Sequence, residues 1–99
     1  MNIVILAAGD FPRKAYPKFL LESADALVCC DSALESALKH GLKVDAVVGD
    51  MDSIKAGVLA GFSGKKIHET EQDFNDLTKT MRYVMSNYHD IDGINILGA

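Results

Sequence analysis

Short, continuous apolar runs alternate with helix-like segments along the whole chain, and this alternation constrains the fold more than any other feature. The first run, after Asn2, reads IVILAA and contains no polar side chain. Such runs are typical of strands buried on both faces, because a face in contact with water would carry alternating polar residues. Strands that alternate with helices form a mostly parallel sheet. We therefore expect an α/β fold in which helices flank an open, mostly parallel sheet.

Apolar spacing and stop residues such as Gly41 define the expected elements. The predicted strands are residues 2–8, 26–30, 45–48, 66–69 and 93–97, and the predicted helices are residues 13–22, 32–40, 54–59 and 74–88. The last helix has the clearest apolar stripe, which we expect to be core. The stripe consists of Phe74, Leu77, Met81, Val84, Met85 and Tyr88.

Composition excludes several classes of protein. The chain has 99 residues, 48% of them hydrophobic and 24% charged, as expected for one globular domain. Its net charge of −4 argues against a nucleic-acid partner, and no apolar run approaches the roughly 20 residues that a membrane span requires. Cys29 and Cys30 are adjacent in a predicted strand, so they point to opposite faces and stay reduced. We expect a cytoplasmic protein.

Acidic residues follow one predicted strand after another. Ten of the 14 acidic residues are Asp, which favours turns and caps over helix interiors. Because the carboxyl ends of parallel strands share one edge, these side chains should gather on one side of the molecule. Close carboxylates repel one another, and a magnesium ion relieves that repulsion. The residues concerned are Asp10, Asp31, Asp50, Asp52, Glu69, Glu71, Asp73 and Asp76, with Lys79 as the nearby basic residue.

Two segments concentrate the acids. In Gly49-Asp50-Met51-Asp52-Ser53, the glycine permits a tight turn that lets both Asp residues reach one metal ion. In 71–79, Asp73 and Asp76 are three residues apart and share a helix face. Simple structural roles are the alternative, because Asp is common in turns and at helix N-termini, and Asp73 is the expected N-cap.

Neither common phosphate-binding motif occurs in the chain. There is no G-x-x-x-x-G-K-[ST] loop and no G-x-G-x-x-G fingerprint. A nucleotide bound here must be held by metal-bridged carboxylates and by backbone groups.

Four segments together resemble the thiamin pyrophosphokinase family over nearly the whole chain. They are Ala8-Gly9-Asp10, Cys30-Asp31-Ser32-Ala33, Gly49-Asp50-Met51-Asp52-Ser53 and Gln72-Asp73-Phe74-Asn75-Asp76-Leu77-Thr78-Lys79. The resemblance implies transfer of a pyrophosphoryl group from ATP to the hydroxyl of thiamin, which gives thiamin diphosphate and AMP. It also implies magnesium as cofactor, a homodimer, and a Rossmann-like α/β domain joined to a carboxy-terminal β-sandwich.

Carried over by position, the resemblance makes Asp50, Asp52 and Asp76 the catalytic carboxylates that hold magnesium. The residues that would contact the nucleotide are Gly9, Asp10, Asp31, Ser32, Gln72, Asp73, Asn75 and Lys79. Residues 1–99 would thus form the ATP- and magnesium-binding α/β domain.

The chain departs from the family pattern at several positions. Ser32-Ala33 stands where the family has Gly-Gly, Asn75 where Thr is usual, and Glu71 where Asp is usual. The family's Gly-x-Arg-x-Asp-His segment would begin near Gly98. The resemblance therefore implies a truncated enzyme without the β-sandwich and inactive by itself.

Three other functions are compatible with the sequence. The acceptor could be a pterin alcohol, because an archaeal type of hydroxymethylpterin pyrophosphokinase resembles the same motifs. Asp50 after the third strand also suits a phospho-receiver module of flavodoxin-like fold, although such modules carry paired acids after the first strand and this chain has only Asp10 there. A binding domain without catalysis is the third possibility.

Overall fold

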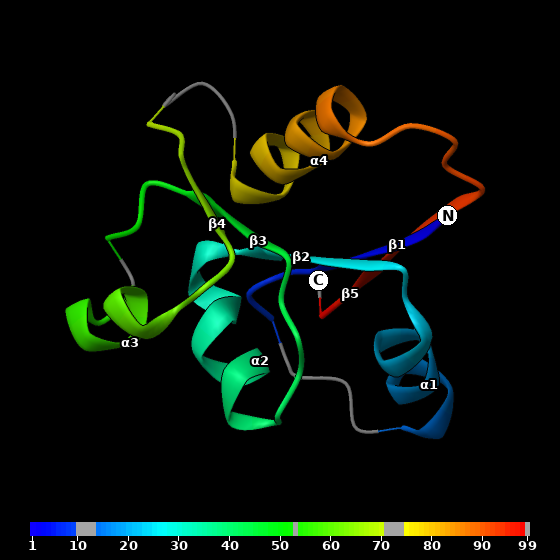
Figure 1. The fold of residues 1–99 in the computed structure, drawn as a ribbon, viewed down its shortest axis with the longest axis horizontal. Coiled ribbons are helices and arrows are strands. Elements are labelled where there is room, and N and C mark those ends of the chain that lie inside the picture. The colour runs from blue at the N-terminus through cyan, green and yellow to red at the C-terminus, as the bar shows by residue number, and fades with distance from the viewer. Residues whose placement is uncertain (10–13, 53, 71–74, 99) are drawn as a thin grey trace.

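The computed structural model describes residues 1–9, 14–52, 54–70 and 75–98 of the chain. These residues form five strands, four α-helices and one 3-10 turn (Figure 1). The strands are β1 (Asn2–Leu6), β2 (Ala26–Cys30), β3 (Ala46–Gly49), β4 (Lys65–His68) and β5 (Gly93–Leu97). The helices are α1 (Ala15–Ser23), α2 (Leu34–Lys39), α3 (Ala56–Gly61) and α4 (Asp76–Asn87), and the turn η1 (Asp31–Ala33) precedes α2. Every predicted element is present.

All five strands pair in parallel, in the order β4-β3-β2-β1-β5. The chain therefore builds the sheet outward from β1 to β4 and then returns to place β5 on the other side of β1. The strand order reverses between β1 and β5, and ligands commonly bind at such a reversal, beyond the carboxyl ends of the strands.

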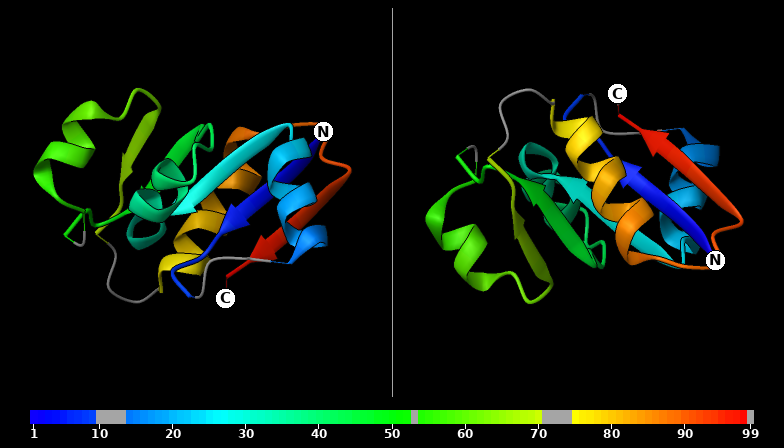
Figure 2. Two further views of the ribbon diagram at one scale, coloured as in Figure 1. Left: turned by 90° about the horizontal axis from the view of Figure 1, so that it is seen from below. Right: turned by 90° about the horizontal axis from the view of Figure 1, so that it is seen from above.

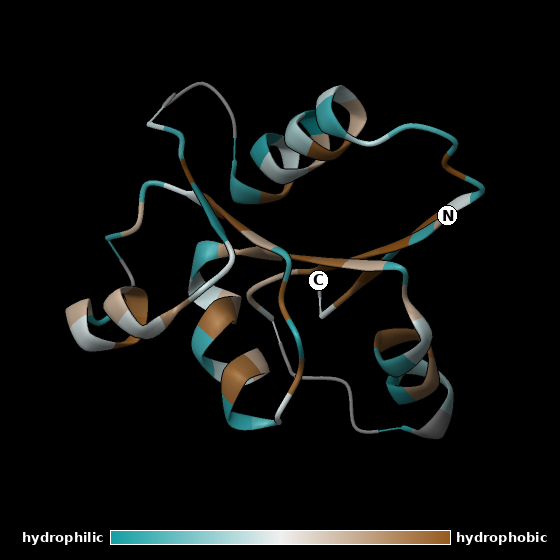
Figure 3. Ribbon diagram, viewed as in Figure 1, coloured by the Kyte–Doolittle hydropathy of each residue, from teal (hydrophilic) through white to brown (hydrophobic). Residues whose placement is uncertain are grey.

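Helices cover both faces of the sheet. Helices α1, α2 and α3 lie on one face and α4 lies alone on the other, as the views along and across the sheet show (Figures 1 and 2). Successive strand residues alternate between the two layers: Val4 and Leu6 pack with the three helices, whereas Ile3 and Ile5 pack toward α4. Apolar residues line the strands between these layers (Figure 3). The expected open parallel α/β sheet is confirmed.

Helix α4 differs from its prediction at two points. Its N-cap is Asn75, whose side chain accepts a hydrogen bond from the Thr78 backbone N–H at 2.8 Å. The prediction of Asp73 as N-cap is therefore wrong, because a helix has one N-cap and Asn75 occupies it. Met85 was also expected in the core, but 62% of its surface is exposed, since Val84 points at the sheet and Met85 is turned away from it.

The strand order also tests the alternative that the chain is a phospho-receiver module. A flavodoxin-like receiver module has the strand order 2-1-3-4-5, in which the reversal falls between the first and third strands. The order here is β4-β3-β2-β1-β5, so the chain is not a receiver module. In the part of the chain that the structure describes, no helix has the length and apolar character needed to span a bilayer.

Candidate functional site

The carboxyl ends of β2 and β3 and the first turn of α4 meet at one edge of the sheet. Asp31 follows β2, Asp50 follows β3, and Asp76 is the first residue of α4. The first turn of α4 lies near the end of β2, because Thr80 contacts both Cys30 and the Asp76 carbonyl, and the negative charge of Asp76 contributes to the raised pKa of Asp31. The structure thus brings together Asp31, Asp50 and Asp76, as the positions of the acids after successive strands predicted.

Asp31 is the most enclosed of these acids, with only 1% of its surface exposed. Its Oδ1 accepts a hydrogen bond from the Ser32 backbone N–H at 2.7 Å, and its Oδ2 accepts one from the Met51 backbone N–H at 3.1 Å. Both carboxylate oxygens are engaged by the protein itself. One of these bonds joins the end of β2 to the turn after β3.

The turn after β3 is tight and strained. Gly49 has φ +153°, and a Cβ atom built there would lie 2.6 Å from Cγ of Asp31, so only glycine lets the strand pass this carboxyl. Met51 has φ +69°, a value uncommon for a residue with a side chain. Oδ1 of Asp50 accepts a hydrogen bond from the Asp52 backbone N–H at 3.0 Å, which closes the turn. The predicted tight turn at Gly49 is present.

Asp31 and Asp50 have opposite pKa shifts. Burial raises the pKa of Asp31 from 3.8 to about 6, and its hydrogen bond with Asp50 and the charge of Asp76 add to the rise. The pKa of Asp50 is lowered, first by the Asp52 N–H and then by the hydrogen bond with Asp31. Lys79 and His68 lower the pKa of Asp50 further through their charge. The proton of the pair therefore resides on Asp31 in preference to Asp50.

A second contact joins α4 to the end of β2. Thr80 is fully buried, and its Oγ1 donates a hydrogen bond to the backbone carbonyl of Asp76 at 2.8 Å. The same Oγ1 lies 3.3 Å from Sγ of Cys30. Sequence reasoning treated Cys30 as a small apolar core residue and did not single out Thr80. The spacing of four residues between Asp76 and Thr80, which places them on one helix face, was the available signal.

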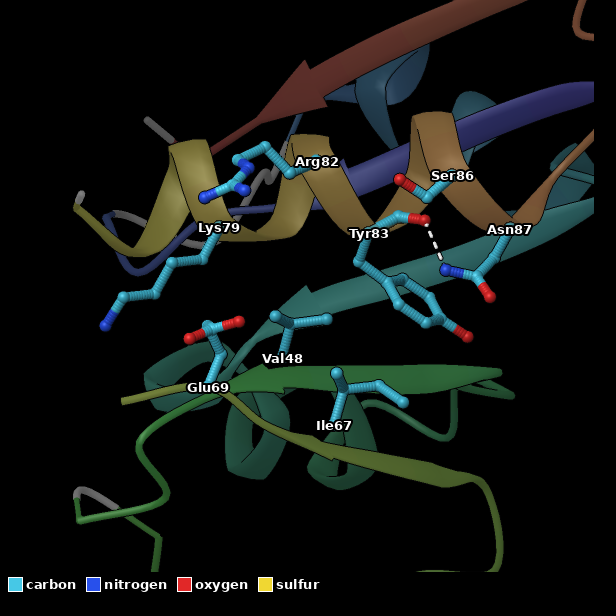
Figure 4. Close-up of a pocket in the computed structure, with 8 residues that line it drawn as sticks. All are labelled: Val48, Ile67, Glu69, Lys79, Arg82, Tyr83, Ser86 and Asn87. Atoms are coloured by element: carbon cyan, nitrogen blue, oxygen red, sulfur yellow. Dashed lines mark hydrogen bonds between the residues drawn. The ribbon is translucent and has the colours of Figure 1, made fainter. Parts of the chain in front are cut away.

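A cleft of about 200 Å³ opens beside the acidic edge, between α4 and the strands β3 and β4 (Figure 4). Val48 and Ile67 form its floor, and Tyr83 projects from α4 toward them (Figure 4). The remaining lining residues are polar or charged: Glu69, Lys79, Arg82, Ser86 and Asn87. Lys79 is 6% exposed, and its charge also lowers the pKa of Asp50 at the acidic edge.

The other predicted site residues lie at different points of this edge. Gly9 is exposed beside the β1–β5 reversal, where its N–H donates to the Gly98 carbonyl at 2.6 Å. Ser32 is exposed after β2, and the carboxylate of Asp52 is exposed on the turn after β3. Asn75 caps α4. Asp10, Gln72 and Asp73 lie outside the described residues.

Magnesium fits the chemistry of the donors at this edge. Asp50, Asp52 and Asp76 offer hard carboxylate oxygens of the kind that magnesium prefers. Within the ranges that the structure describes, no three His, Cys, Asp or Glu side chains are arranged to hold a metal ion. The assignment of Asp50, Asp52 and Asp76 as metal ligands therefore stays a prediction.

Comparison with protein families gives one match. Residues 17–99 match the model of the thiamin pyrophosphokinase catalytic domain. This range includes β2, β3, α4 and the described residues of the acidic edge. No curated protein matches the chain.

Several solved structures share the fold. A thiamin pyrophosphokinase family protein from Enterococcus faecalis superposes with a TM-score of 0.77 at 19% identity, covering 99% of this chain and 46% of that one. Thiamin pyrophosphokinase from Candida albicans gives a TM-score of 0.75 at 22% identity, covering 90% of this chain and 32% of that one. Yeast thiamin pyrophosphokinase gives a TM-score of 0.70 at 19% identity, covering 90% of this chain and 32% of that one. The chain spans less than half the length of each of these structures.

Proposed function

Because the chain belongs to the family of thiamin pyrophosphokinase catalytic domains, we propose that it is the nucleotide- and metal-binding part of an enzyme that makes thiamin diphosphate. In the proposed reaction the hydroxyl oxygen of thiamin forms a bond to the β-phosphorus of ATP. The bond from that phosphorus to the oxygen retained by AMP breaks, and the hydroxyl releases its proton. Residues 1–99 form the α/β domain of this enzyme.

The observation that best supports the proposal is the close pair of carboxyls, Asp31 and Asp50, at the sheet edge. Asp31 and Asp50 come from different strands, and the pKa of Asp31 is raised to about 6 beside Asp76. Perturbed carboxyls of this kind cluster at functional sites. Pyrophosphoryl transfer requires a site for a divalent cation and for phosphate oxygens, and this edge has acceptors for the cation and Lys79 for the phosphates.

Asp50, Asp52 and Asp76 hold magnesium in this proposal, and bound magnesium neutralises phosphate charge and orients the phosphate chain. Lys79, held at 6% exposure beside Asp50, adds a fixed positive charge at the mouth of the cleft. The proposed nucleotide contacts are Gly9, Asp10, Asp31, Ser32, Gln72, Asp73, Asn75 and Lys79.

We also propose an oligomeric state, an acceptor substrate and a cellular compartment for the enzyme. The family resemblance supports a homodimer and thiamin as the acceptor. Cys29 and Cys30 are both free and buried, which suits the reducing cytoplasm.

A thermal melt of the chain with magnesium, with ATP and with both tests metal and nucleotide binding. A ligand that binds only the folded state at ten times its Kd adds about 1.4 kcal/mol, which raises the Tm of a domain this size by about 6–11 °C. We expect that gain only when magnesium and ATP are both present. Asp52→Asn should melt as high as wild type without ligand, because it removes a negative charge, and should lose most of the gain.

Asp45→Asn is the matched control. Asp45 accepts the Leu27 backbone N–H at 2.8 Å, before β3 and therefore at the opposite edge of the sheet, so its variant should keep the full ligand gain. A wild-type melt unmoved by magnesium and ATP together would contradict the proposed binding function. A full gain retained by Asp52→Asn would remove Asp52 from the metal site.

A further inference from the structure

The end of β2 is attached to both acid-bearing segments of the site. We propose that Thr80 and Asp31 are positioning residues, which fix the first turn of α4 and the turn after β3 to the end of β2 and so set where Asp76 and Asp50 lie at this edge of the sheet. The inference rests on the proposed function, because it assigns what holds that site together. The nucleotide contact proposed for Asp31 comes from the family resemblance alone, and because the side chain is 1% exposed with both oxygens bonded to the protein, we assign it this structural role in place of that contact.

Asp31 attaches the turn after β3. Its Oδ2 accepts the Met51 N–H at 3.1 Å, and its carboxyl lies against Gly49, where no Cβ fits. Met51 itself is held at φ +69°, a conformation that a residue with a side chain leaves unless its surroundings impose it. The bond from Asp31 therefore acts on the residue between Asp50 and Asp52. This hydrogen bond therefore fixes the backbone positions from which the side chains of Asp50 and Asp52 extend.

Thr80 attaches α4. A threonine inside a helix often bonds the carbonyl one turn back, and the bond from Thr80 Oγ1 to the Asp76 carbonyl is of this kind. The contact with Cys30 goes further, because Cys30 belongs to β2 and Sγ lies 3.3 Å from the same hydroxyl. Strand, hydroxyl and first helical turn thus form one chain of contacts ending at Asp76.

The burial of Thr80 shows that it can position other residues but cannot contact a ligand itself. Thr80 has no exposed surface, so it acts on a bound ion only through the residues it holds. Cys30 and Asp31 are consecutive, and the first faces α4 whereas the second faces the turn after β3. Two neighbouring residues of one buried strand end therefore set the relative placement of two segments that are distant in sequence.

Substitutions at Thr80 give the sharper test. Thr80→Val removes the hydroxyl at nearly constant volume, and Thr80→Ser retains it. Manganese is the probe, because it suits the same carboxylates and free manganese is measured directly by electron paramagnetic resonance. We expect Thr80→Val to weaken manganese binding at least about fivefold relative to wild type, which is about 1 kcal/mol. Thr80→Ser should restore binding to within about twofold of wild type.

Asp31 is tested without metal. In Asp31→Ala, the Met51 amide should exchange with solvent at least about tenfold faster than in wild type, measured by NMR and compared with amides of the sheet interior. Asp45→Ala is the matched control, because it removes a carboxylate that accepts the Leu27 N–H at the opposite edge. It should leave both Met51 exchange and manganese binding unchanged.

The outcomes separate the two proposals. Unchanged Met51 exchange in Asp31→Ala, or manganese binding that is equal in wild type and Thr80→Val, overturns the positioning roles. A loss that Thr80→Ser fails to restore also overturns the role of the hydroxyl. If wild type binds no manganese, the proposed metal site fails, and the positioning of the turn is then decided by the Met51 exchange rates alone.

Discussion

Raising the pH from about 5 to about 7.5 without divalent metal should destabilise the protein through one buried carboxyl. Asp31 has its pKa raised from 3.8 to about 6, mainly by burial. Between these two values the folded state binds the proton and the unfolded state has already released it. The free energy of unfolding therefore falls as the pH rises through this window, and the loss is complete somewhat above pH 6.

The magnitude follows from the shift. The difference between 3.8 and about 6 is about 2.2 pKa units, or about 3 kcal/mol in all at 1.36 kcal/mol per unit, and about one unit of it, or about 1.4 kcal/mol, lies above pH 5. This is an upper value, because Asp31 and Asp50 titrate as a pair. The lowered pKa of Asp50 has the opposite sign, since its stabilisation is present above 3.8 and is lost only in more acidic solution. The two contributions therefore fall in separate pH windows.

Urea denaturation at several pH values, in the presence of a chelator, measures the effect. Between about pH 5 and about pH 7.5 wild type should lose at most about 1.4 kcal/mol, because only about one unit of the shift lies above pH 5. Asp31→Asn, which has no proton to lose, should give a nearly flat profile. Every other ionisable group is common to both proteins, so the difference between the two profiles isolates Asp31. Parallel profiles for wild type and Asp31→Asn would refute the assignment of the raised pKa.

Two further substitutions test the local geometry. Gly49→Ala should lower the free energy of unfolding by about 2–5 kcal/mol in urea denaturation, because its Cβ would lie 2.6 Å from Cγ of Asp31 at φ +153°. Gly93→Ala is its control, with no atom closer than 3.4 Å, and an equal loss there would show that the contact with Asp31 is unimportant. Asn75→Ala should lose about 1 kcal/mol in the same assay by removing the N-cap of α4, and Asn75→Asp should keep that stability. Equal stability of Asn75→Ala and wild type would mean that the side-chain bond to Thr78 contributes nothing.

The abundance of Asp shows where sequence reasoning reached its limit. Placement of acids at element ends was predicted, and was interpreted as a sign of a site. Three other Asp residues, none of them assigned to the site, hold the starts of strands at the opposite edge. The Asn2 N–H donates to Asp25 at 2.6 Å, the Leu27 N–H donates to Asp45 at 2.8 Å, and the amino terminus pairs with Asp92 at 2.8 Å. A sequence shows that an Asp lies next to a strand but not which chain neighbour it meets.

The order of strands and helices could be predicted from the sequence, because each element depends on residues close to it in the chain. Continuous apolar runs such as Val4 to Leu6 mark buried strands, and glycine with two aspartates marks the turn after β3. The gathering of Asp31, Asp50 and Asp76 at one edge also followed, since strand ends in a parallel sheet share that edge. The family resemblance rested on the same short segments.

Only the tertiary structure decided how these residues act on one another. The strand order placed β5 beside β1 and excluded the receiver module, although both folds alternate strands with helices. The pKa of Asp31 is raised because β2 is covered on both sides and Asp50 approaches from a neighbouring strand. Thr80 gained its contact with Cys30 across 50 residues of chain. Burial and close approach between distant segments are properties of the packed molecule, and local sequence carries no direct record of them.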